Sequence, residues 1–295
     1  MTTIGLLHPG EMGASVGAAA RAEGSRVLWA SEGRSTDTWA RAATAELDDV
    51  VTLPAVVAAS DVIVSVCPPH AACDVASAVA GAGFRGLYVD ANAVAPATSR
   101  AIAGIVEAAG ATYVDGGIIG PPPDKPGTTR LYLSGAQAAR VAALFTKGPL
   151  EAIVLPGELA AASAIKMAYG GWNKGQQALL LSIVALATSE GVAEALMAEW
   201  KRSQPDLPKR AENAARGSSR KAWRWIAEME ENAATLDAAG LPAGFHQGAA
   251  EIYKRLAPYK DAGVPPTLED VAKGLLTGES RGGRGPLRQP GSDKS

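Results

Sequence analysis

The order of predicted strands and helices constrains the fold of this chain more than any other feature of its sequence. Over the first 156 residues, short β-rich runs alternate with alanine-rich stretches of helical periodicity. This alternation favours βαβ units and a mostly parallel sheet with right-handed crossovers. Strands are predicted at Ile4–Leu7, Val27–Ala30, Val62–Val66, Gly86–Val89, Tyr113–Val114, Arg130–Leu133 and Ile153–Leu155. Helices are predicted near 13–23, 36–46, 53–58, 71–82, 97–109 and 136–145.

The alternation stops near Pro156 and Gly157, after which the sequence indicates helices only. These are predicted at about 159–190, 192–202, 209–236, 243–256 and 267–276. We therefore expect an α/β domain with a doubly wound parallel sheet over residues 1–156 and an all-helical domain over 157–278. Residues 279–295 are rich in Gly, Arg, Ser and Pro, which predicts a flexible tail.

Composition excludes several classes of protein. With 47% hydrophobic and 20% charged residues, the chain has ordinary globular composition, and a net charge of −2 argues against a nucleic-acid-binding surface over the whole molecule. The two cysteines, Cys67 and Cys73, form no CxxC pair, so neither a disulfide framework nor a metal site is expected. No signal peptide or membrane span is visible, which favours a cytoplasmic protein without membrane partners.

A glycine-containing turn follows the first predicted strand, with the sequence His8-Pro9-Gly10-Glu11-Met12-Gly13. It matches a dinucleotide-binding fingerprint G-x-G-x-x-G in its second and third glycines, and His8 replaces the first. Gly10 would let backbone N–H groups approach a pyrophosphate, and Gly13 would let the helix pack close to the strand. We expect residues 10–13 to bind a nicotinamide dinucleotide in a Rossmann-type domain.

The residues at the end of the second predicted strand indicate whether the dinucleotide is NAD or NADP. Enzymes that use NAD usually place an acidic residue there to bind the ribose 2′-hydroxyl, and this position is Ser31. Ser31 followed by Arg34 suits a 2′-phosphate, whereas Glu32 argues for NAD. The sequence favours NADP as the cofactor and leaves NAD open.

Later segments complete a recognisable pattern. They are Ser65-Val66-Cys67-Pro68-Pro69, the run from Tyr88 through Asn92 to Pro96, Asp115-Gly116-Gly117-Ile118-Ile119-Gly120, and the run from Ala161 to Lys166. With Met12, these segments resemble the β-hydroxyacid dehydrogenase and 6-phosphogluconate dehydrogenase superfamily over about residues 3–260. The Gly-Gly-Trp-Asn run after Lys166 is similar to a subgroup with a phosphogluconate-dehydrogenase-like C-terminal domain.

This resemblance implies roles for individual residues. Lys166 would be the catalytic lysine; Cys67, Pro68 and Asn92 would lie beside the cofactor; Ile119 and Gly120 would bind substrate. It also implies a homodimer formed through the helical domain.

The chain departs from the family at three positions. Ile119 stands where the family has a serine that binds the substrate carboxylate, and Gly170 stands where it has an asparagine. The family's second lysine would fall near Ala227, beside Glu228, and is missing. The resemblance therefore implies a dehydrogenase fold for this chain, but it does not imply the family's substrate.

The helix around Lys166 is largely apolar, so we expect a lowered lysine pKa that suits proton transfer near neutral pH. Gly170, Asn173 and Gln177 follow Lys166 at helical spacing, which predicts one shared face. Asn173 and Gln177 are candidate substrate ligands. Gly170 would leave room for a ligand or for a second helix packed closely against it.

The function these features favour is hydride transfer between a nicotinamide and a carbon that bears a hydroxyl or carbonyl group, in a small polar substrate. Lys166 would act as general acid and base, and Asn92, Gly120 and Asn173 would orient the substrate. Two alternatives stay open: an NADPH-dependent imine reductase, which Lys166 argues against, and a cofactor-binding sensor without turnover.

Overall fold

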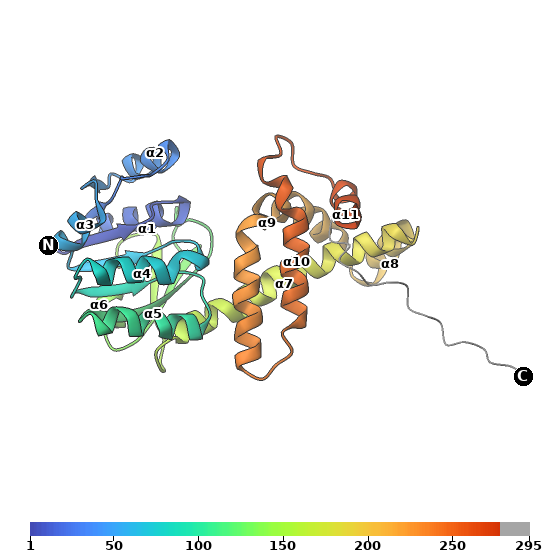
Figure 1. Ribbon diagram of the computed structural model, residues 1–295. Helices are drawn as coiled ribbons and strands as arrows, with labels where there is room; N and C mark the ends of the chain where they lie inside the picture. Colours follow the sequence, from blue (N-terminus) through green and yellow to red (C-terminus); the bar gives the residue numbers. More distant parts are fainter. Residues whose placement is uncertain (278–295) are drawn as a thin grey trace, which may run out of the picture. The chain divides into compact units, whose positions relative to one another are not determined.

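The computed structural model describes residues 1–277, so the tail predicted at 279–295 lies outside the described residues. The chain divides into two compact units (Figure 1). The first comprises residues 1–176 and 224–250, and the second comprises 177–223 and the chain from 251 onward. Three helices contribute to both units: α7 (Ala161–Ser189), α9 (Leu207–Ala238) and α10 (Gly244–Leu256). The change from alternating elements to helices alone falls between residues 154 and 161.

The first unit is built on an eight-stranded sheet with the order β3-β2-β1-β4-β5-β6-β7-β8. All neighbouring strands pair in parallel except β6 and β7, which are antiparallel. The predicted doubly wound, mostly parallel sheet is confirmed. The strands are β1 (Thr3–Leu7), β2 (Arg26–Trp29), β3 (Asp48–Asp49), β4 (Val62–Ser65), β5 (Leu87–Asp90), β6 (Thr112–Ile119), β7 (Thr129–Ser134) and β8 (Leu150–Val154).

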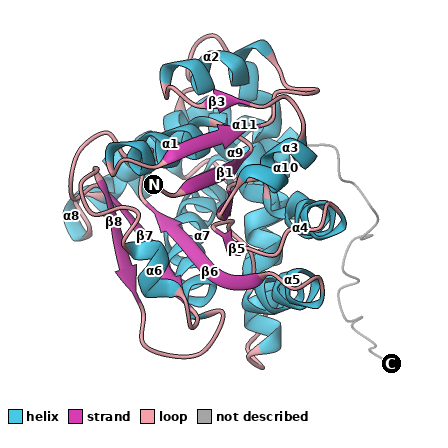
Figure 2. Ribbon diagram, turned by 90° about the vertical axis from the view of Figure 1, so that its left-hand side faces the viewer, coloured by secondary structure: helices cyan, strands magenta, loops and turns pink. Residues whose placement is uncertain are grey.

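Helices cover both faces of this sheet. Side chains of α1, α2 and α6 bury one face, where Ile4 and Leu6 also point, and side chains of α3, α4 and α5 bury the other, which receives Leu7. Figure 2 shows α4 and α5 on one side of the strands and α6 on the other. The elements are α1 (Glu11–Ala22), α2 (Thr36–Thr44), α3 (Leu53–Ala59), the 3₁₀ turn η1 (Pro69–Ala71), α4 (Ala72–Gly81), α5 (Pro96–Ala108) and α6 (Ala138–Ala142).

Two strands differ from the sequence-based prediction. The pairing of Asp48 and Asp49 with β2 has no sequence signal, because acidic residues rarely form strands. Strand β6 is eight residues long rather than two, since it continues through Gly116 and Gly117 to pair with β7. Glycine weakens a strand locally, so the sequence does not indicate this extension, which is supported by pairing to β7.

The carboxyl ends of the parallel strands carry the loops that matter for a ligand. Strand β6 is parallel to β5 and extends beyond it. Ile118 and Ile119 therefore lie beyond the same end of the sheet as the carboxyl ends of β1, β4 and β5. Gly120 opens the connection to β7 with a φ of +129°, and an added Cβ would collide with the Thr128 carbonyl. In open α/β sheets this edge is where ligands bind.

The second unit is helical. It contains the later part of α7, α8 (Ala193–Ser203), the first part of α9, the end of α10, the 3₁₀ turn η2 (Ala257–Asp261) and α11 (Leu268–Thr277). Its buried side chains include Leu181, Trp200, Tyr253 and Leu256. The Arg255 guanidinium donates to the Leu275 carbonyl at 3.1 Å, which links α10 to α11. The helices predicted from periodicity in this region are all present.

Candidate functional site

The turn after β1 has the geometry of a dinucleotide-binding turn. Gly10 is the N-cap of α1 without a side-chain cap, and nothing lies within 4 Å of the position its Cβ would occupy. A Cβ on Gly13 would instead collide with the carbonyl oxygen of His8. Gly10 thus leaves the helix N-terminus open to an anion, and Gly13 permits the close packing of α1 against β1.

His8, which replaces the first glycine of the fingerprint, has a left-handed backbone conformation. Its φ is +66°, a left-handed value that costs a non-glycine residue some strain. Burial, with a smaller effect from Arg34, lowers the pKa of His8 to about 4, so the imidazole is neutral near pH 7. Its Nδ1 is buried without a hydrogen-bond partner. The sequence indicates the missing glycine but not this partly buried, neutral histidine.

His8 and Arg34 line the same cavity of about 250 Å³ at the ends of β1 and β2. Leu7, Ala30 and Leu53 contribute apolar walls. Ser31 is buried, and its carbonyl accepts the Arg34 N–H at 3.1 Å. Ser31 and Arg34, which the sequence predicts at the cofactor ribose, are therefore neighbours at the edge expected for a nucleotide.

The first turn of α1 holds an acidic residue that could repel a pyrophosphate. Glu11 is paired there with Arg224 of α9, with 2.9 Å between Oε2 and Nη1. Met12 packs against the hydrophobic core under the sheet. The open helix N-terminus, the neutralised Glu11 and the cavity beside Arg34 together fit an anionic dinucleotide.

The loops after β4 and β5 are held together by Asn92. Its side chain accepts the Cys67 N–H at 2.6 Å and donates to Ser65 Oγ at 3.1 Å. Burial raises the pKa of the Cys67 thiol to about 11. The thiol is therefore protonated near neutral pH and is not an activated nucleophile. Pro68 precedes η1 on the same loop. Cys67, Pro68 and Asn92 thus lie together at the carboxyl edge, with the Asn92 amide engaged inside the protein.

Asp115 anchors the start of α7. Its two carboxylate oxygens accept four hydrogen bonds, from the hydroxyls of Ser99, Ser134 and Ser163 and from the Ser163 N–H. Ser134 Oγ also accepts the Ala162 N–H at 3.1 Å. All four side chains are buried. A carboxylate at a helix N-terminus satisfies free N–H groups and favours the helix dipole, so Asp115 fixes where α7 begins.

Gly117 brings α7 close to β6. A Cβ at this position would lie 2.5 Å from the Ala162 carbonyl and 3.1 Å from the Lys166 Cβ. The Lys166 ammonium donates to the Ile118 carbonyl at 2.7 Å, and the side chain is 17% exposed. The predicted catalytic lysine therefore reaches the carboxyl edge of the sheet. Burial lowers the pKa of Lys166, as the apolar helix predicts, with Glu228 opposing the shift and Lys174 adding to it.

Glu228 of α9 lies between Lys166 and Lys174. It forms an ion pair with the Lys174 ammonium, and its Oε1 lies 3.9 Å from Lys166 Nζ. The two lysines hold the pKa of this buried carboxyl below its usual range, although burial itself acts in the other direction. Sequence reasoning placed Glu228 beside a missing lysine but did not identify it or Lys174 as site residues. The signal available was the glycine pair Gly170 and Gly171 on α7, which faces Glu228 and Asn232 of α9.

Gly170 and Gly171 accommodate side chains of α9. A Cβ on Gly170 would lie 3.0 Å from Glu228 Oε1, and one on Gly171 would lie 2.7 Å from Asn232 Oδ1. The close-packing interpretation of Gly170 is therefore confirmed. His246 of α10 approaches the same segment, with its Nε2 3.2 Å from the Gly171 carbonyl.

The candidate substrate ligands are distributed unevenly. Ile119 is buried, and Gly120 begins the turn after β6. The Asn173 amide donates to the Tyr169 carbonyl of its own helix at 3.0 Å. Gln177 belongs to the second unit, where it accepts a hydrogen bond from Ser218. Ile119 directly follows Ile118, whose carbonyl accepts from Lys166. Asn173 is engaged within α7, and Gln177 is engaged between α7 and α9.

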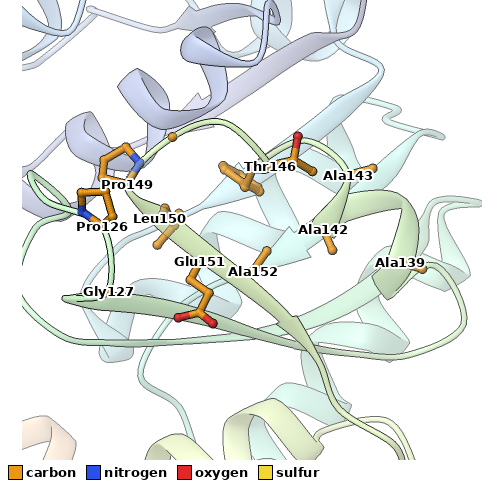
Figure 3. Close-up of a pocket in the computed structure, with 12 residues that line it drawn as sticks. Pro126, Gly127, Ala139, Ala142, Ala143, Thr146, Pro149, Leu150, Glu151 and Ala152 are labelled. Carbon is orange, nitrogen blue, oxygen red and sulfur yellow. The ribbon is translucent and has the colours of Figure 1, made fainter.

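A further cavity of about 600 Å³ lies at the β8 edge of the sheet (Figure 3). It is lined mainly by small apolar residues of α6, the following loop and β8, with Glu151 as its charged member. Residues 1–277 contain no group of three or more His, Cys, Asp or Glu side chains arranged to hold a metal ion. Nor does this part of the chain contain a helix long and apolar enough to cross a membrane.

Part of the helical region matches a known family model. The model of a domain of unknown function, DUF1932, matches residues 187–256. An uncharacterized 28.5 kDa protein in the 7S RNA 5′ region of Methanothermus fervidus is 31% identical over 139 residues. This match covers 47% of the chain and 52% of that protein, so the chain spans about half the length of the curated relative it matches.

Solved structures match over almost the whole chain. A conserved protein of unknown function, whose structure revealed similarity with 3-hydroxyacid dehydrogenases, is 27% identical with a TM-score of 0.65, covering 87% of this chain and 97% of that one. A 3-hydroxyisobutyrate dehydrogenase from Mycobacterium tuberculosis, solved with L-serine, is 18% identical with a TM-score of 0.66 and coverage of 93% and 99%.

A more distant match is a reductive aminase from Aspergillus terreus in complex with NADPH4, cyclohexanone and allyl amine. It is 19% identical, with a TM-score of 0.52 and coverage of 93% and 98%. At these identities the solved enzymes show the fold. The resemblance predicted from the sequence motifs is confirmed by these structural relatives.

Proposed function

We propose that this chain, which by its fold belongs with the 3-hydroxyacid dehydrogenases and related nicotinamide-dependent oxidoreductases, transfers a hydride between a nicotinamide and a hydroxyl or carbonyl carbon of a small polar substrate. The observation that carries this proposal is Lys166, a buried amine held by the Ile118 carbonyl at the carboxyl edge of the sheet. The dinucleotide turn at Gly10 opens at that same edge.

Different residues would bind the cofactor, position the loops beside it and transfer the proton. The open N-terminus of α1 and Gly10 would hold the pyrophosphate, and the nicotinamide would supply the hydride chemistry. Asn92 fixes the two loops that flank this position. Lys166 has a lowered pKa, so its amine can accept the hydroxyl proton during oxidation and return it during reduction.

NADP is the cofactor we propose, because Arg34 lies in the cavity at the ends of β1 and β2 where a 2′-phosphate would need a cation. Tryptophan fluorescence titrations with NADPH and NADH test this. We expect tighter NADPH binding, and Arg34→Ala should weaken NADPH binding about tenfold while leaving NADH binding unchanged. Equal loss for both cofactors would show that Arg34 does not contact the 2′-phosphate.

Lys166→Met tests the catalytic proposal. Loss of general acid–base catalysis should lower turnover by about 10²- to 10⁴-fold, while NADPH affinity stays within twofold. The substrate panel should contain hydroxy acids, amino-hydroxy acids and alcohols. Turnover of a panel member by the methionine variant at the wild-type rate would contradict the role of Lys166. If no panel member is oxidised although NADPH binds, the sensor alternative gains support.

Imine reduction is the second candidate, and Ile119 favours it. This buried apolar residue stands where a carboxylate-binding serine is expected, so the substrate end of β6 suits a less polar compound. Reduction of cyclic imines by NADPH, tested beside the hydroxy-acid panel, separates the two reactions. Faster imine reduction that survives Lys166→Met would favour this second candidate.

We also propose that the chain forms a homodimer through α7. Tyr169 and Trp172 are exposed on α7 of the first unit, by 48% and 70%, and large aromatic side chains are typical of protein interfaces. Light scattering after size-exclusion chromatography should give twice the chain mass. A monomer at micromolar concentration would contradict this proposal.

A further inference from the structure

Three charged side chains form a buried cluster beside the proposed catalytic position, and hydride transfer itself does not require two of them. Lys166 and Lys174 lie on α7, and Glu228 lies on α9, all within the first unit. The two lysine side chains are each 17% exposed, and the glutamate is 8% exposed. We define Lys166, Lys174 and Glu228 as the charge cluster. Charged side chains are rarely buried because removing them from water costs free energy, so a functional role for the charge cluster is expected.

The hydrogen bonds within the charge cluster are unequal. Lys174 pairs directly with Glu228 through Oε2 and also lies 5.4 Å from the centre of the Trp225 ring. Lys166 Nζ is 3.9 Å from Glu228 Oε1, beyond hydrogen-bond distance, and donates instead to the Ile118 carbonyl. Oε1 is buried and accepts no hydrogen bond. The carboxylate is therefore engaged by Lys174 and lies at ion-pair distance from Lys166 without hydrogen-bonding to it.

The backbone of α7 makes this arrangement specific. Gly170 lies one turn after Lys166, and any Cβ there would approach Glu228 Oε1 to 3.0 Å. One residue later, Gly171 makes room for Asn232, whose amide donates to the Glu228 carbonyl at 2.8 Å. Two adjacent glycines inside a helix cost about 1 kcal/mol each relative to alanine, so local helix preference does not explain them. They permit α9 to bring Glu228 against α7.

The charged groups that act on Lys166 come from two elements. Helix α9 contributes the Glu228 carboxylate, and α7 contributes the Lys174 ammonium. Strand β6 contributes only the neutral Ile118 carbonyl as a hydrogen-bond acceptor. A carboxylate favours the protonated amine, and a second ammonium disfavours it, so the two neighbours act on Lys166 in opposite directions.

We propose that Glu228 and Lys174 are positioning residues that set the protonation state of Lys166, with Lys174 holding the Glu228 carboxylate beyond hydrogen-bond distance of Lys166. This inference rests on the proposed role of Lys166 as general acid and base. In this arrangement Glu228 limits how easily Lys166 loses its proton, and Lys174 prevents a close ion pair that would keep the amine permanently protonated.

The two positioning residues have opposite expected effects when they are removed. In Lys174→Met, the Glu228 carboxylate is released and can pair with Lys166, so the amine should stay protonated to higher pH. In Glu228→Gln, the anion is lost and Lys174 remains, so the amine should lose its proton at lower pH. Loss of packing alone would not produce opposite shifts in two variants of one cluster.

The protonation of Lys166 can be measured on the full chain without a substrate. Acetic anhydride reacts only with neutral amines, so labelling at a series of pH values, read at Lys166 by peptide mass spectrometry, gives a titration midpoint. We expect the midpoint to rise by about one pH unit in Lys174→Met and to fall by at least about one in Glu228→Gln. Lys209→Met, which removes an exposed lysine paired with Glu212 in the second unit, is the matched control and should leave it unchanged.

Shifts in the same direction, or no shift in either variant, would overturn the inference. Should Glu228→Gln fail to fold, Glu228→Asp replaces it, since the shorter carboxylate withdraws from Lys166 and should also lower the midpoint. Because the midpoint is measured without turnover, it is independent of the proposed reaction. Opposite shifts together with full activity of Lys166→Met would refute the catalytic role and leave the charge cluster assignment standing.

Discussion

Two polar clusters contact the first half of α7, and they are built in contrasting ways. At the start of the helix, the carboxylate of Asp115 accepts four hydrogen bonds from Ser99, Ser134 and Ser163. In the charge cluster, Glu228 lies between two ammonium groups, and its Oε1 accepts no hydrogen bond. Both clusters are buried, but only the second contains a lysine with a shifted pKa.

This difference indicates that the Asp115 cluster anchors α7, whereas the charge cluster controls the protonation of a lysine. A buried carboxylate whose oxygens are all satisfied by neutral donors is held in one position, and it stabilises the contact between α7 and β6. A carboxylate with an unsatisfied oxygen beside a desolvated amine costs stability, yet it controls proton affinity. We therefore expect substitutions in the first cluster to change unfolding and substitutions in the second to change titration.

The largest expected effect is on the Asp115 cluster. Asp115→Ala would leave the Ser163 N–H and three hydroxyls without their acceptor, so the free energy of unfolding should fall by about 5 kcal/mol. Urea denaturation followed by circular dichroism measures this. Ser134→Ala, which removes one donor to Asp115 and the acceptor of the Ala162 N–H, should cost about 2 kcal/mol. A loss below 1 kcal/mol for Asp115→Ala would show that the cluster is not an anchor.

Asp90 is an intermediate case, a buried carboxyl with one satisfied oxygen. It accepts the Asn92 N–H at 2.9 Å, while its Oδ2 accepts no hydrogen bond, and burial raises its pKa from 3.8 to about 7. Below pH 4 the folded and unfolded states are both protonated. Between pH 4 and 7 the unfolded state releases the proton first, so this group's contribution to stability is lost as pH rises.

Asp90→Asn removes that titration and keeps an acceptor for Asn92. The stability of the variant relative to wild type should therefore increase between pH 4 and pH 8, by up to about 4 kcal/mol. Urea unfolding at several pH values measures the difference. A constant difference across this range would mean that Asp90 titrates normally in the folded protein.

The smallest expected change in stability is in the charge cluster. Gly170→Ala gains about 1 kcal/mol of helix preference and loses a similar amount where the new methyl group meets Glu228 Oε1. The free energy of unfolding should change by less than about 1 kcal/mol, while the Lys166 titration midpoint falls as the carboxylate is displaced. Gly104→Ala on α5 is the matched control, because nothing lies within 4 Å of its added Cβ. It should gain about 1 kcal/mol without affecting Lys166, and the same midpoint in both variants would contradict the charge cluster model.

The sequence predicts most of the fold because hydrophobic periodicity and turn residues are local signals. Strands β1, β2, β4 and β5 and the helices of both units appear where their patterns place them. The prediction fails for β3 and for the second half of β6, where Asp48, Asp49, Gly116 and Gly117 have poor strand preference. There the hydrogen bonds of neighbouring strands override local preference.

The sequence by itself determined the glycine turn after β1, the place of Lys166 in an apolar helix and the resemblance to the hydroxyacid dehydrogenases, and it predicted that the turn binds a dinucleotide. Each is carried by short segments whose residues lie close together in the chain, so that their spacing is visible in the sequence. Only the tertiary structure decided that His8 is a partly buried, neutral imidazole, that Asp115 anchors α7, and that Glu228 lies between Lys166 and Lys174. These features join residues 48 and 62 positions apart, and the physical reason is that burial and electrostatic interaction depend on distance in space.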